Sequence, residues 1–248
     1  MDRVWNKKRV AVVTGAGRGI GRAIATALAR AGAAVAVLDR DDEAGNSAVA
    51  EIGSDAAYFP VDMANNDEIK RVMSAVAERF GAIDILVNNV GVLSTASISE
   101  ITEAEWRRVI DINLTSAVFA SQCAVPYMEQ AQWGRIVNIA SMAGRMGGVS
   151  TGVAYSVSKA ALLGFTMYLA RNLARRNITV NAIAPGPTKT ELLDGFTPAQ
   201  VKNLEDSIPL RRLGKPENIA ETVVFLASDA AEFMTGATVD VNGGLFMG

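Results

Sequence analysis

The chain has 248 residues, 50% of them hydrophobic, which is enough for the core of a single α/β domain spanning residues 1–248. A formal net charge of −2, one cysteine and no histidine exclude a basic nucleic-acid surface, an internal disulfide, a Cys/His zinc site and histidine acid–base chemistry. Because no apolar run approaches the roughly 18 residues of a membrane span and no signal-peptide core precedes the first predicted strand, we expect a soluble, cytoplasmic protein without a bound metal.

A glycine-rich turn near the amino terminus is the first sign of a ligand. An apolar run that starts at Val10 predicts a buried strand and an Ala-rich segment at 23–29 predicts a helix, with Thr14-Gly15-Ala-Gly-Arg18-Gly19-Ile20-Gly21 between them. The spacing is T-G-x-x-x-G-x-G, since Ile20 stands where the last glycine of G-x-G-x-x-G would fall. Glycines allow positive φ and the close approach of a phosphate to a helix N-terminus. The turn therefore predicts a dinucleotide pyrophosphate site, with a ligand-free glycine loop as the alternative.

Asp39 bears on which dinucleotide binds. It follows the next predicted strand, at 33–38, where a carboxylate accepts hydrogen bonds from both hydroxyls of the adenosine ribose and repels a 2′-phosphate. Arg18 and Arg40 favour NADP instead, because a guanidinium can clamp that phosphate. We expect NAD, with NADP as the alternative.

Polar residues also follow the next two predicted strands, at 56–59 and 83–87. Asp62 and Met63 come after the first of them, and Asp62 is either a helix cap or a contact to adenine. The sequence Asn88-Asn89-Val90-Gly91 comes after the second, and its asparagines either satisfy turn backbone or belong to a site. All of them would lie at the carboxyl edge of the sheet, where open α/β sheets bind ligands.

A predicted helix at 102–128 carries Asn113 in its apolar middle. An amide in that position needs partners, so it is either a core hydrogen-bonding group or part of a proton or water network. After a strand at 135–140, Ser141 opens a long glycine-rich loop, which is more often a site than a connector.

Tyr155 and Lys159 follow in a predicted helix at 154–176. Their i, i+4 spacing puts the phenol and the ammonium on one face, about 5.4 Å apart along the axis. A cation beside the phenol lowers its pKa from about 10 and brings proton transfer within range near neutral pH. Such a pair is common on exposed helices, so it gains meaning only together with the loop and the nucleotide turn.

The last third of the chain adds a further strand end and an irregular segment. A strand at 178–184 ends in Pro185-Gly186-Pro187-Thr188-Lys189-Thr190, and a helix at 216–227 and a strand at 237–241 complete the order. The region at about 188–213 is irregular and predicts either a substrate lid or surface packing.

Taken together, these motifs resemble the short-chain dehydrogenase/reductase family along essentially the whole chain. Thr14 to Gly21 is similar to its cofactor loop, Asn88 to Gly91 to its N-N-A-G strand end with Val90 in place of alanine, and Tyr155 to Lys159 to its Y-x-x-x-K. The resemblance implies an α/β, Rossmann-type, doubly wound seven-stranded parallel sheet with helices on both faces, and a homotetramer or homodimer.

The resemblance also implies roles for individual residues. Tyr155 would exchange the proton of the substrate, Ser141 would bind the substrate oxygen, Lys159 would lower the pKa of Tyr155 and hold the nicotinamide ribose, and Asn113 would position a relay water. The implied cofactor-binding residues are Gly15, Arg18, Gly19, Ile20, Gly21, Asp39, Asp62, Met63, Asn89, Gly91, Tyr155, Lys159, Pro185, Gly186, Thr188 and Thr190.

The expected function is therefore an NAD(H)-dependent oxidoreductase that interconverts a secondary alcohol and a ketone. The alternatives are an NADPH-dependent 3-oxoacyl-(acyl-carrier-protein) reductase and a nucleotide-sensing protein without turnover. We expect the substrate pocket to be formed by residues 141–153 and 191–213, with Arg145 as either an anion-binding group or a surface residue.

Overall fold

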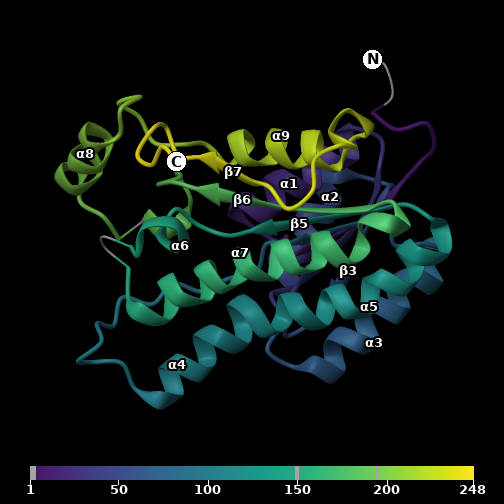
Figure 1. Cartoon of the computed structure of the whole chain (residues 1–248), viewed down its shortest axis with the longest axis horizontal. Coiled ribbons are helices and arrows are strands. Elements are labelled where there is room, and N and C mark those ends of the chain that lie inside the picture. The colour runs from purple at the N-terminus through teal and green to yellow at the C-terminus, as the bar shows by residue number, and fades with distance from the viewer. Residues whose placement is uncertain (1–3, 149–150, 194) are drawn as a thin grey trace.

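The computed structural model describes residues 4–148, 151–193 and 195–248, which fold around one parallel β-sheet (Figure 1). Within these residues, seven strands pair in the order β3-β2-β1-β4-β5-β6-β7. Their bounds are β1 Val10–Thr14, β2 Ala34–Asp39, β3 Ala56–Pro60, β4 Ile85–Asn88, β5 Gly134–Ile139, β6 Ile178–Pro185 and β7 Thr238–Val241. The strand order reverses between β1 and β4, and this switch point is where doubly wound sheets bind ligands.

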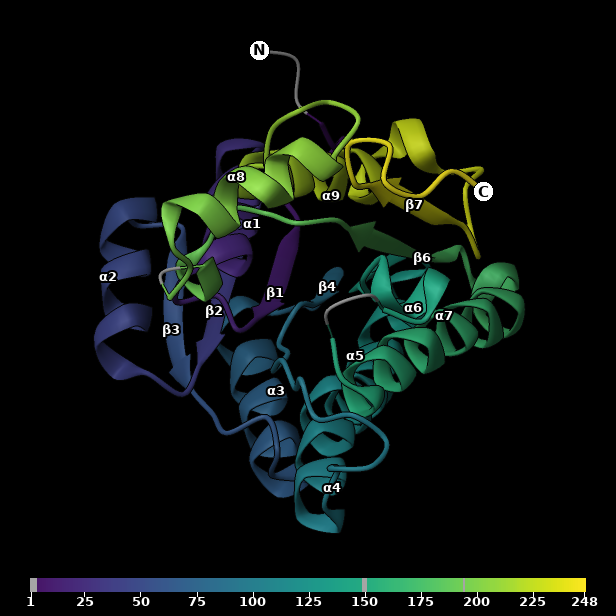
Figure 2. The same ribbon diagram turned by 90° about the vertical axis from the view of Figure 1, so that its left-hand side faces the viewer.

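Helices cover both faces of the sheet (Figures 1 and 2). One face is covered by α1 (Gly19–Arg30), α2 (Asp42–Ile52) and α9 (Pro216–Ala227), and the other by α3 (Asn66–Phe80), α5 (Ser116–Ala131) and α7 (Val153–Leu173). Alternate residues of β1 point to different cores: Ala11 and Val13 to the first, Val12 to the second. This confirms the predicted Rossmann-type architecture.

The helix predicted at 102–128 is not uniform. It consists of α4 (Glu103–Ile110), a π-helical turn at Asp111–Thr115 and then α5. Such turns insert one extra residue into a helix and occur often at functional sites. Here the turn contains Asn113, which the apolar periodicity places in the helix without revealing the distortion.

Two continuous helical stretches, at 103–131 and 153–176, are long and apolar enough to cross a membrane by length and composition alone. This differs from the sequence-based expectation, which rested on uninterrupted apolar runs, because the mean hydropathy over 18 residues reaches 1.2 in each helix. Both stretches bury apolar side chains against the sheet, such as Met128 and Ala170. Core packing therefore accounts for part of their apolar character, since 44% and 39% of the two windows are buried.

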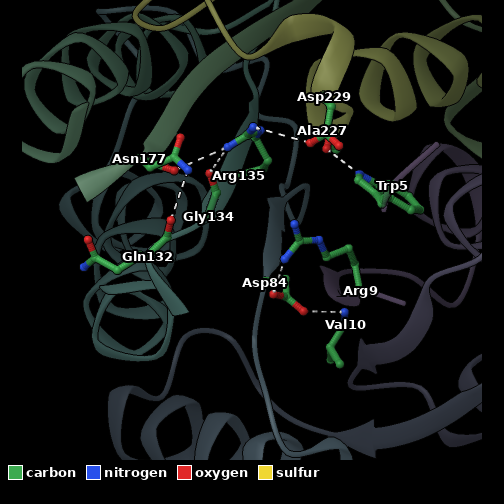
Figure 3. A network of polar contacts seen from close by, with 10 residues as sticks. All are labelled: Trp5, Arg9, Val10, Asp84, Gln132, Gly134, Arg135, Asn177, Ala227 and Asp229. Carbon is green, nitrogen blue, oxygen red and sulfur yellow. Dashed lines mark hydrogen bonds and ion pairs between the residues drawn. The ribbon is translucent and has the colours of Figure 1, made fainter. Parts of the chain in front are cut away.

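The amino ends of the strands are held by a buried ionic network (Figure 3). The guanidinium of Arg9 lies 3.2 Å from a carboxylate oxygen of Asp84, and the second oxygen accepts a hydrogen bond from the Val10 N–H at 2.9 Å. The ring of Trp133 lies between two guanidinium groups, 3.5 Å from Arg9 and 4.2 Å from Arg135. This network lies at the edge opposite the switch-point site.

Candidate active site

The carboxyl ends of β1, β4 and β5 bring the predicted site residues to one edge of the sheet. Thr14 ends β1, Asn88 ends β4, and Ser141 follows shortly after β5. Figure 2 shows the molecule from this side, with α6 (Ala143–Met146) and α8 (Pro198–Ser207) around the edge.

The glycine-rich turn leaves backbone N–H groups of α1 open to a ligand. Gly15 and Gly19 have φ of 63° and 55°, in the left-handed region that favours glycine. A Cβ on Gly21 would lie 2.0 Å from the Gly15 carbonyl oxygen, so only glycine lets α1 pack on the turn. Ile20 packs on the core, and the N-cap residue Arg18 makes no capping hydrogen bond among the described residues. A helix N-terminus of this kind favours a phosphate, so the turn fits a pyrophosphate.

The Asp39 carboxylate is fixed beside this turn. One oxygen accepts a hydrogen bond from the Gly17 N–H at 2.8 Å and the other from the Asp41 N–H at 3.1 Å. Each oxygen keeps a lone pair for a ribose hydroxyl. Arg18 is paired with the Asp41 carboxylate, and Arg40 is exposed.

Asp62 and Met63 occupy the turn between β3 and α3. The Asp62 carboxylate accepts a hydrogen bond from the Ala64 N–H at 2.9 Å, and Asn65, not Asp62, is the N-cap of α3. Asp62 is exposed and Met63 is buried in the core. The structure thus gives Asp62 a turn-stabilising contact, and its contact to adenine stays a prediction.

Asn89 joins β4 to the glycine-rich turn. Its side-chain amide donates hydrogen bonds to the carbonyl oxygens of Thr14 at 2.9 Å and Gly15 at 3.1 Å. The Thr14 hydroxyl in turn accepts the N–H groups of Asn89 and Val90, each at 3.0 Å. These contacts set the shape of the switch point.

Lys159 is the buried cation of the site. Its ammonium donates a hydrogen bond to the Ile139 carbonyl at 2.8 Å, and burial lowers the pKa of Lys159 to about 8. A Cβ on Gly91 would lie 3.2 Å from Lys159 Nζ and 3.4 Å from Asn113 Oδ1. The absence of a side chain at Gly91 therefore lets these two polar groups approach the same point.

Asn113 is held firmly in the π turn. Its Oδ1 accepts the Val92 N–H at 2.7 Å, and its Nδ2 donates to the Val92 carbonyl at 3.0 Å and to the Ser158 hydroxyl at 3.1 Å. Ser158 donates to the Tyr155 carbonyl at 2.8 Å. Asn113 is therefore linked to the helix that carries Tyr155 and Lys159.

Tyr155 and Ser141 belong to the same cluster of polar side chains as Lys159 and Asn113. Burial raises the pKa of Tyr155, and a hydrogen bond with the Ser141 hydroxyl acts in the opposite direction. Lys159 Nζ lies 5.9 Å from the centre of the Tyr155 ring and is bound to Ile139. The expected lowering of the tyrosine pKa by Lys159 is not seen here, because the ammonium faces a carbonyl and burial of the phenol dominates.

The segment after β6 passes over the glycine-rich turn. Pro185 ends β6, and the Thr188 hydroxyl donates to the Gly186 carbonyl at 3.0 Å. A Cβ on Gly19 would lie 3.6 Å from Thr190 Cγ2, which places Thr190 next to the predicted phosphate site.

A cavity beside α6 and the start of α7 includes part of the predicted pocket, since Gly144, Gly147 and Gly152 line it. It has a volume of 640 Å³ and is lined by α6, the start of α7 and the 95–98 loop, including Ile98, Gly144 and Val157. Neither Ser141 nor Tyr155 lines this cavity, so the part of residues 191–213 in a substrate pocket stays a prediction. Residues 149 and 150 of the predicted pocket lie outside the described residues.

Arg145 is engaged within the protein. Its guanidinium lies 3.6 Å from an Asp240 carboxylate oxygen and 4.7 Å from the centre of the Phe246 ring. Neither sequence-based expectation for Arg145, an anion-binding group or a surface residue, describes this half-buried clamp.

Sequence reasoning missed Tyr58 and Ser158, and it placed Thr14 in the glycine-rich turn without its contact to Asn89. Thr14 and Tyr58 bind neighbours far along the chain, Asn89 and Asp39, which no local pattern indicates. Ser158 could have been found, since it lies one residue before Lys159 on the same helix.

Comparisons with known proteins give matches over almost the whole chain. A family model described as enoyl-(acyl carrier protein) reductase matches residues 15–246. The chain is 40% identical over 245 residues to a 3-oxoacyl-(acyl-carrier-protein) reductase of Synechocystis sp., covering 96% of this chain and 97% of that protein. It is 41% identical over 242 residues to the reductase of the same description from Staphylococcus aureus, covering 96% and 98%.

Two solved structures are similar throughout. The crystal structure of gox2181 has a TM-score of 0.93 at 34% identity, covering 98% of this chain and 97% of that one. A protein from Agrobacterium tumefaciens, provisionally described as a gluconate dehydrogenase, has a TM-score of 0.93 at 32% identity, covering 99% and 98%. With the glycine-rich turn, the N-N-V-G strand end and the Tyr155–Lys159 pair at one sheet edge, these matches show that the chain belongs to the short-chain dehydrogenase/reductase family of oxidoreductases.

Proposed function

We propose that the protein interconverts a secondary alcohol and a ketone with NAD(H), and that Tyr155 is its general acid/base. The observation that supports this most directly is Lys159, a buried amine with a pKa of about 8, one helical turn from Tyr155 at the switch-point edge. A phenol and an amine beside a dinucleotide turn can move a proton near neutral pH.

In this proposal the four catalytic residues have separate tasks. Tyr155 removes the hydroxyl proton when an alcohol is oxidised and returns it when a ketone is reduced, and Ser141 donates a hydrogen bond to that oxygen. Lys159 holds the nicotinamide ribose and passes a proton onward, because a pKa of about 8 lets it gain and lose one near neutral pH. Asn113, fixed by Val92 and Ser158, positions the water that receives it. When bound, the nicotinamide accepts or supplies the hydride.

The choice of NAD over NADP rests on the acidic turn around Asp39. Its carboxylate has free lone pairs for two ribose hydroxyls and would repel a 2′-phosphate. Arg18, one of the two arginines that could clamp a phosphate, is already paired with Asp41. NADP stays the alternative through Arg40, which is exposed beside Asp39.

The test is steady-state kinetics with each cofactor over a panel of secondary alcohols and ketones. We expect turnover with NADH and NAD, and a kcat/KM with NADPH at least about tenfold lower, because a carboxylate and a phosphate would be in contact. A preference for NADPH that is lost in Arg40→Ala would overturn the NAD assignment. Tight cofactor binding without turnover on any substrate would favour the nucleotide-sensing alternative.

A second candidate is reduction of a 3-oxoacyl thioester carried by an acyl carrier protein. It is favoured by relatives of that description at 40% and 41% identity over almost the whole chain. A 3-oxoacyl thioester is a ketone, so the same four residues would serve. Comparison of an acetoacetyl thioester with simple ketones in the panel separates the two candidates.

We propose that the chain works in the cytoplasm as a homotetramer or homodimer. Strand β7 lies at the edge of the sheet and is only partly buried, and Phe225 on α9 and Phe233 between α9 and β7 are exposed. An uncovered sheet edge with exposed aromatic groups favours pairing with a second copy. Light scattering after size-exclusion chromatography tests this, and a monomer at micromolar concentration would contradict it.

We also propose residues 188–213 as a substrate lid on the single domain. The segment begins beside Gly19, and its far end is tied to the carboxyl-terminal region, where the Leu210 N–H donates to the Gly243 carbonyl at 3.2 Å. Protection of this segment from limited proteolysis by bound NADH is the expected result, and equal cleavage with and without cofactor would contradict it.

A further inference from the structure

Tyr58 reaches across from β3 to the turn that carries Asp39. Its hydroxyl lies 2.8 Å from a carboxylate oxygen of Asp42, the first residue of α2, and 3.1 Å from the main-chain carbonyl oxygen of Asp39. Tyr58 and Asp39 are 19 positions apart along the chain. The hydroxyl thus binds both the end of β2 and the start of α2.

A glycine in α2 makes room for this contact. A Cβ on Gly45 would lie 2.2 Å from Cε2 and 2.3 Å from Cδ2 of the Tyr58 ring, far inside van der Waals distance. Glycine destabilises the interior of a helix relative to alanine, so Gly45 needs a packing reason. The reason is that the Tyr58 ring packs directly against the backbone of α2 at Gly45.

The surroundings of Tyr58 keep its hydroxyl a donor. Burial, the hydrogen bond to Asp42 and the charges of Asp42, Asp39 and Asp41 all raise the pKa of Tyr58. The phenol is therefore protonated at neutral pH. Its proton is available for Asp42 or for the Asp39 carbonyl.

The carboxylate of Asp39 is also held in place. The Asp39 carboxylate accepts the N–H groups of Gly17 and Asp41, and a Cβ on Gly17 would lie 2.9 Å from Asp39 Oδ2. The side chain of Asp39 is thus held by the glycine-rich turn, and its main chain is held by Tyr58. A shift of the main chain would move the carboxylate relative to the loop.

We infer that Tyr58 is a positioning residue for cofactor selection: its hydroxyl ties Asp39 to Asp42 and so holds the Asp39 carboxylate where it receives the ribose hydroxyls. This inference rests on the proposed use of NAD(H). It assigns no contact between Tyr58 and the cofactor. Its effect is on the preference between NADH and NADPH, since only NADH gains ribose hydrogen bonds from the Asp39 carboxylate, whereas the 2′-phosphate of NADPH would be repelled by it.

The test is Tyr58→Phe, which keeps the ring and removes only the hydroxyl. We expect the dissociation constant of NADH, measured by calorimetry, to rise about fivefold while that of NADPH changes less than about twofold. Tyr127→Phe, the same change on α5 on the opposite face of the sheet, should leave both constants as they are. Unchanged NADH binding in Tyr58→Phe, or equal weakening of both cofactors, would overturn the inference.

Two matched substitutions at Asp42 test the hydrogen bond between Tyr58 and Asp42 from the side of its acceptor. Asp42→Asn and Asp42→Ala both lose the charge, but only the second loses the acceptor for the Tyr58 hydroxyl. Asp42→Ala should bind NADH about as weakly as Tyr58→Phe, with no further loss in the double variant, and Asp42→Asn should stay near the wild type. Equal dissociation constants of NADH in Asp42→Asn and Asp42→Ala would overturn the inference. A preference of the wild-type protein for NADPH would overturn the NAD assignment instead.

Discussion

The carboxylate of Asp41 pairs with the guanidinium of Arg18 and also accepts the Ala44 N–H at 2.9 Å, so one side chain caps α2 and restrains the glycine-rich turn. The Ala44 N–H and the charge of Arg18 hold the pKa of Asp41 below its usual range, so it is ionised at neutral pH. Arg18, one of the two arginines that could clamp a 2′-phosphate, is thereby held by a carboxylate.

Asp41→Asn should shift the cofactor preference toward NADPH. Asparagine is as good an N-cap as aspartate, so α2 keeps its cap while Arg18 loses its charged partner. We expect the KM for NADPH to fall about fivefold with little change in kcat. Steady-state kinetics checks this, and the gain should vanish in the double variant with Arg18→Ala. An unchanged KM for NADPH would mean that Arg18 does not reach the phosphate.

Tyr155→Phe should abolish turnover without loss of cofactor affinity. Only the phenolic oxygen is removed, and the ring still fills its partly buried position on α7. General acid/base groups contribute about 10²- to 10⁴-fold to rate, so we expect a kcat lower by at least about 10²-fold. NADH binding is followed by calorimetry on the same preparation. Turnover near the wild-type value would refute the proton-transfer role.

The sequence predicts the sheet and the residues at its carboxyl edge because both depend on local pattern. Apolar runs define the strands, and Asp39, Asn89 and Ser141 are found by their position just after a strand. What it does not predict are contacts that depend on two distant segments. The direction of the Lys159 ammonium toward Ile139 is one of these, and the π turn around Asn113 is a distortion that the apolar pattern does not reveal.

Lys159→Met should stabilise the protein at neutral pH, with a gain that shrinks as pH rises. Burial lowers the Lys159 pKa to about 8 from its ordinary value of 10.5, so the unfolded chain binds more protons between these values and wild-type stability rises across that window. Below pH 8 the full unfavourable effect of the buried charge, about 3 kcal/mol, is present.

Urea unfolding at pH 7 and pH 9.5 measures this difference. The stability gain of Lys159→Met over the wild type should be smaller at the higher pH. The exposed Lys70→Met on α3 serves as the control and should show no such dependence. A gain that is the same at both pH values would mean that the folded protein holds Lys159 in one charge state throughout.

Asp84→Ala should destabilise the protein strongly and leave catalysis intact. The change removes the carboxylate from the buried Arg9 guanidinium and from the Val10 N–H, and an unpaired buried charge costs about 3–5 kcal/mol. Asp55→Ala is a matched control, because it breaks an exposed ion pair with Lys8, and such pairs contribute about 0–1 kcal/mol. Urea unfolding gives both values, and kcat should stay within about twofold because the network lies at the edge opposite Tyr155. A loss for Asp84→Ala no larger than that for Asp55→Ala would show that stacking on Trp133 alone suffices to hold Arg9.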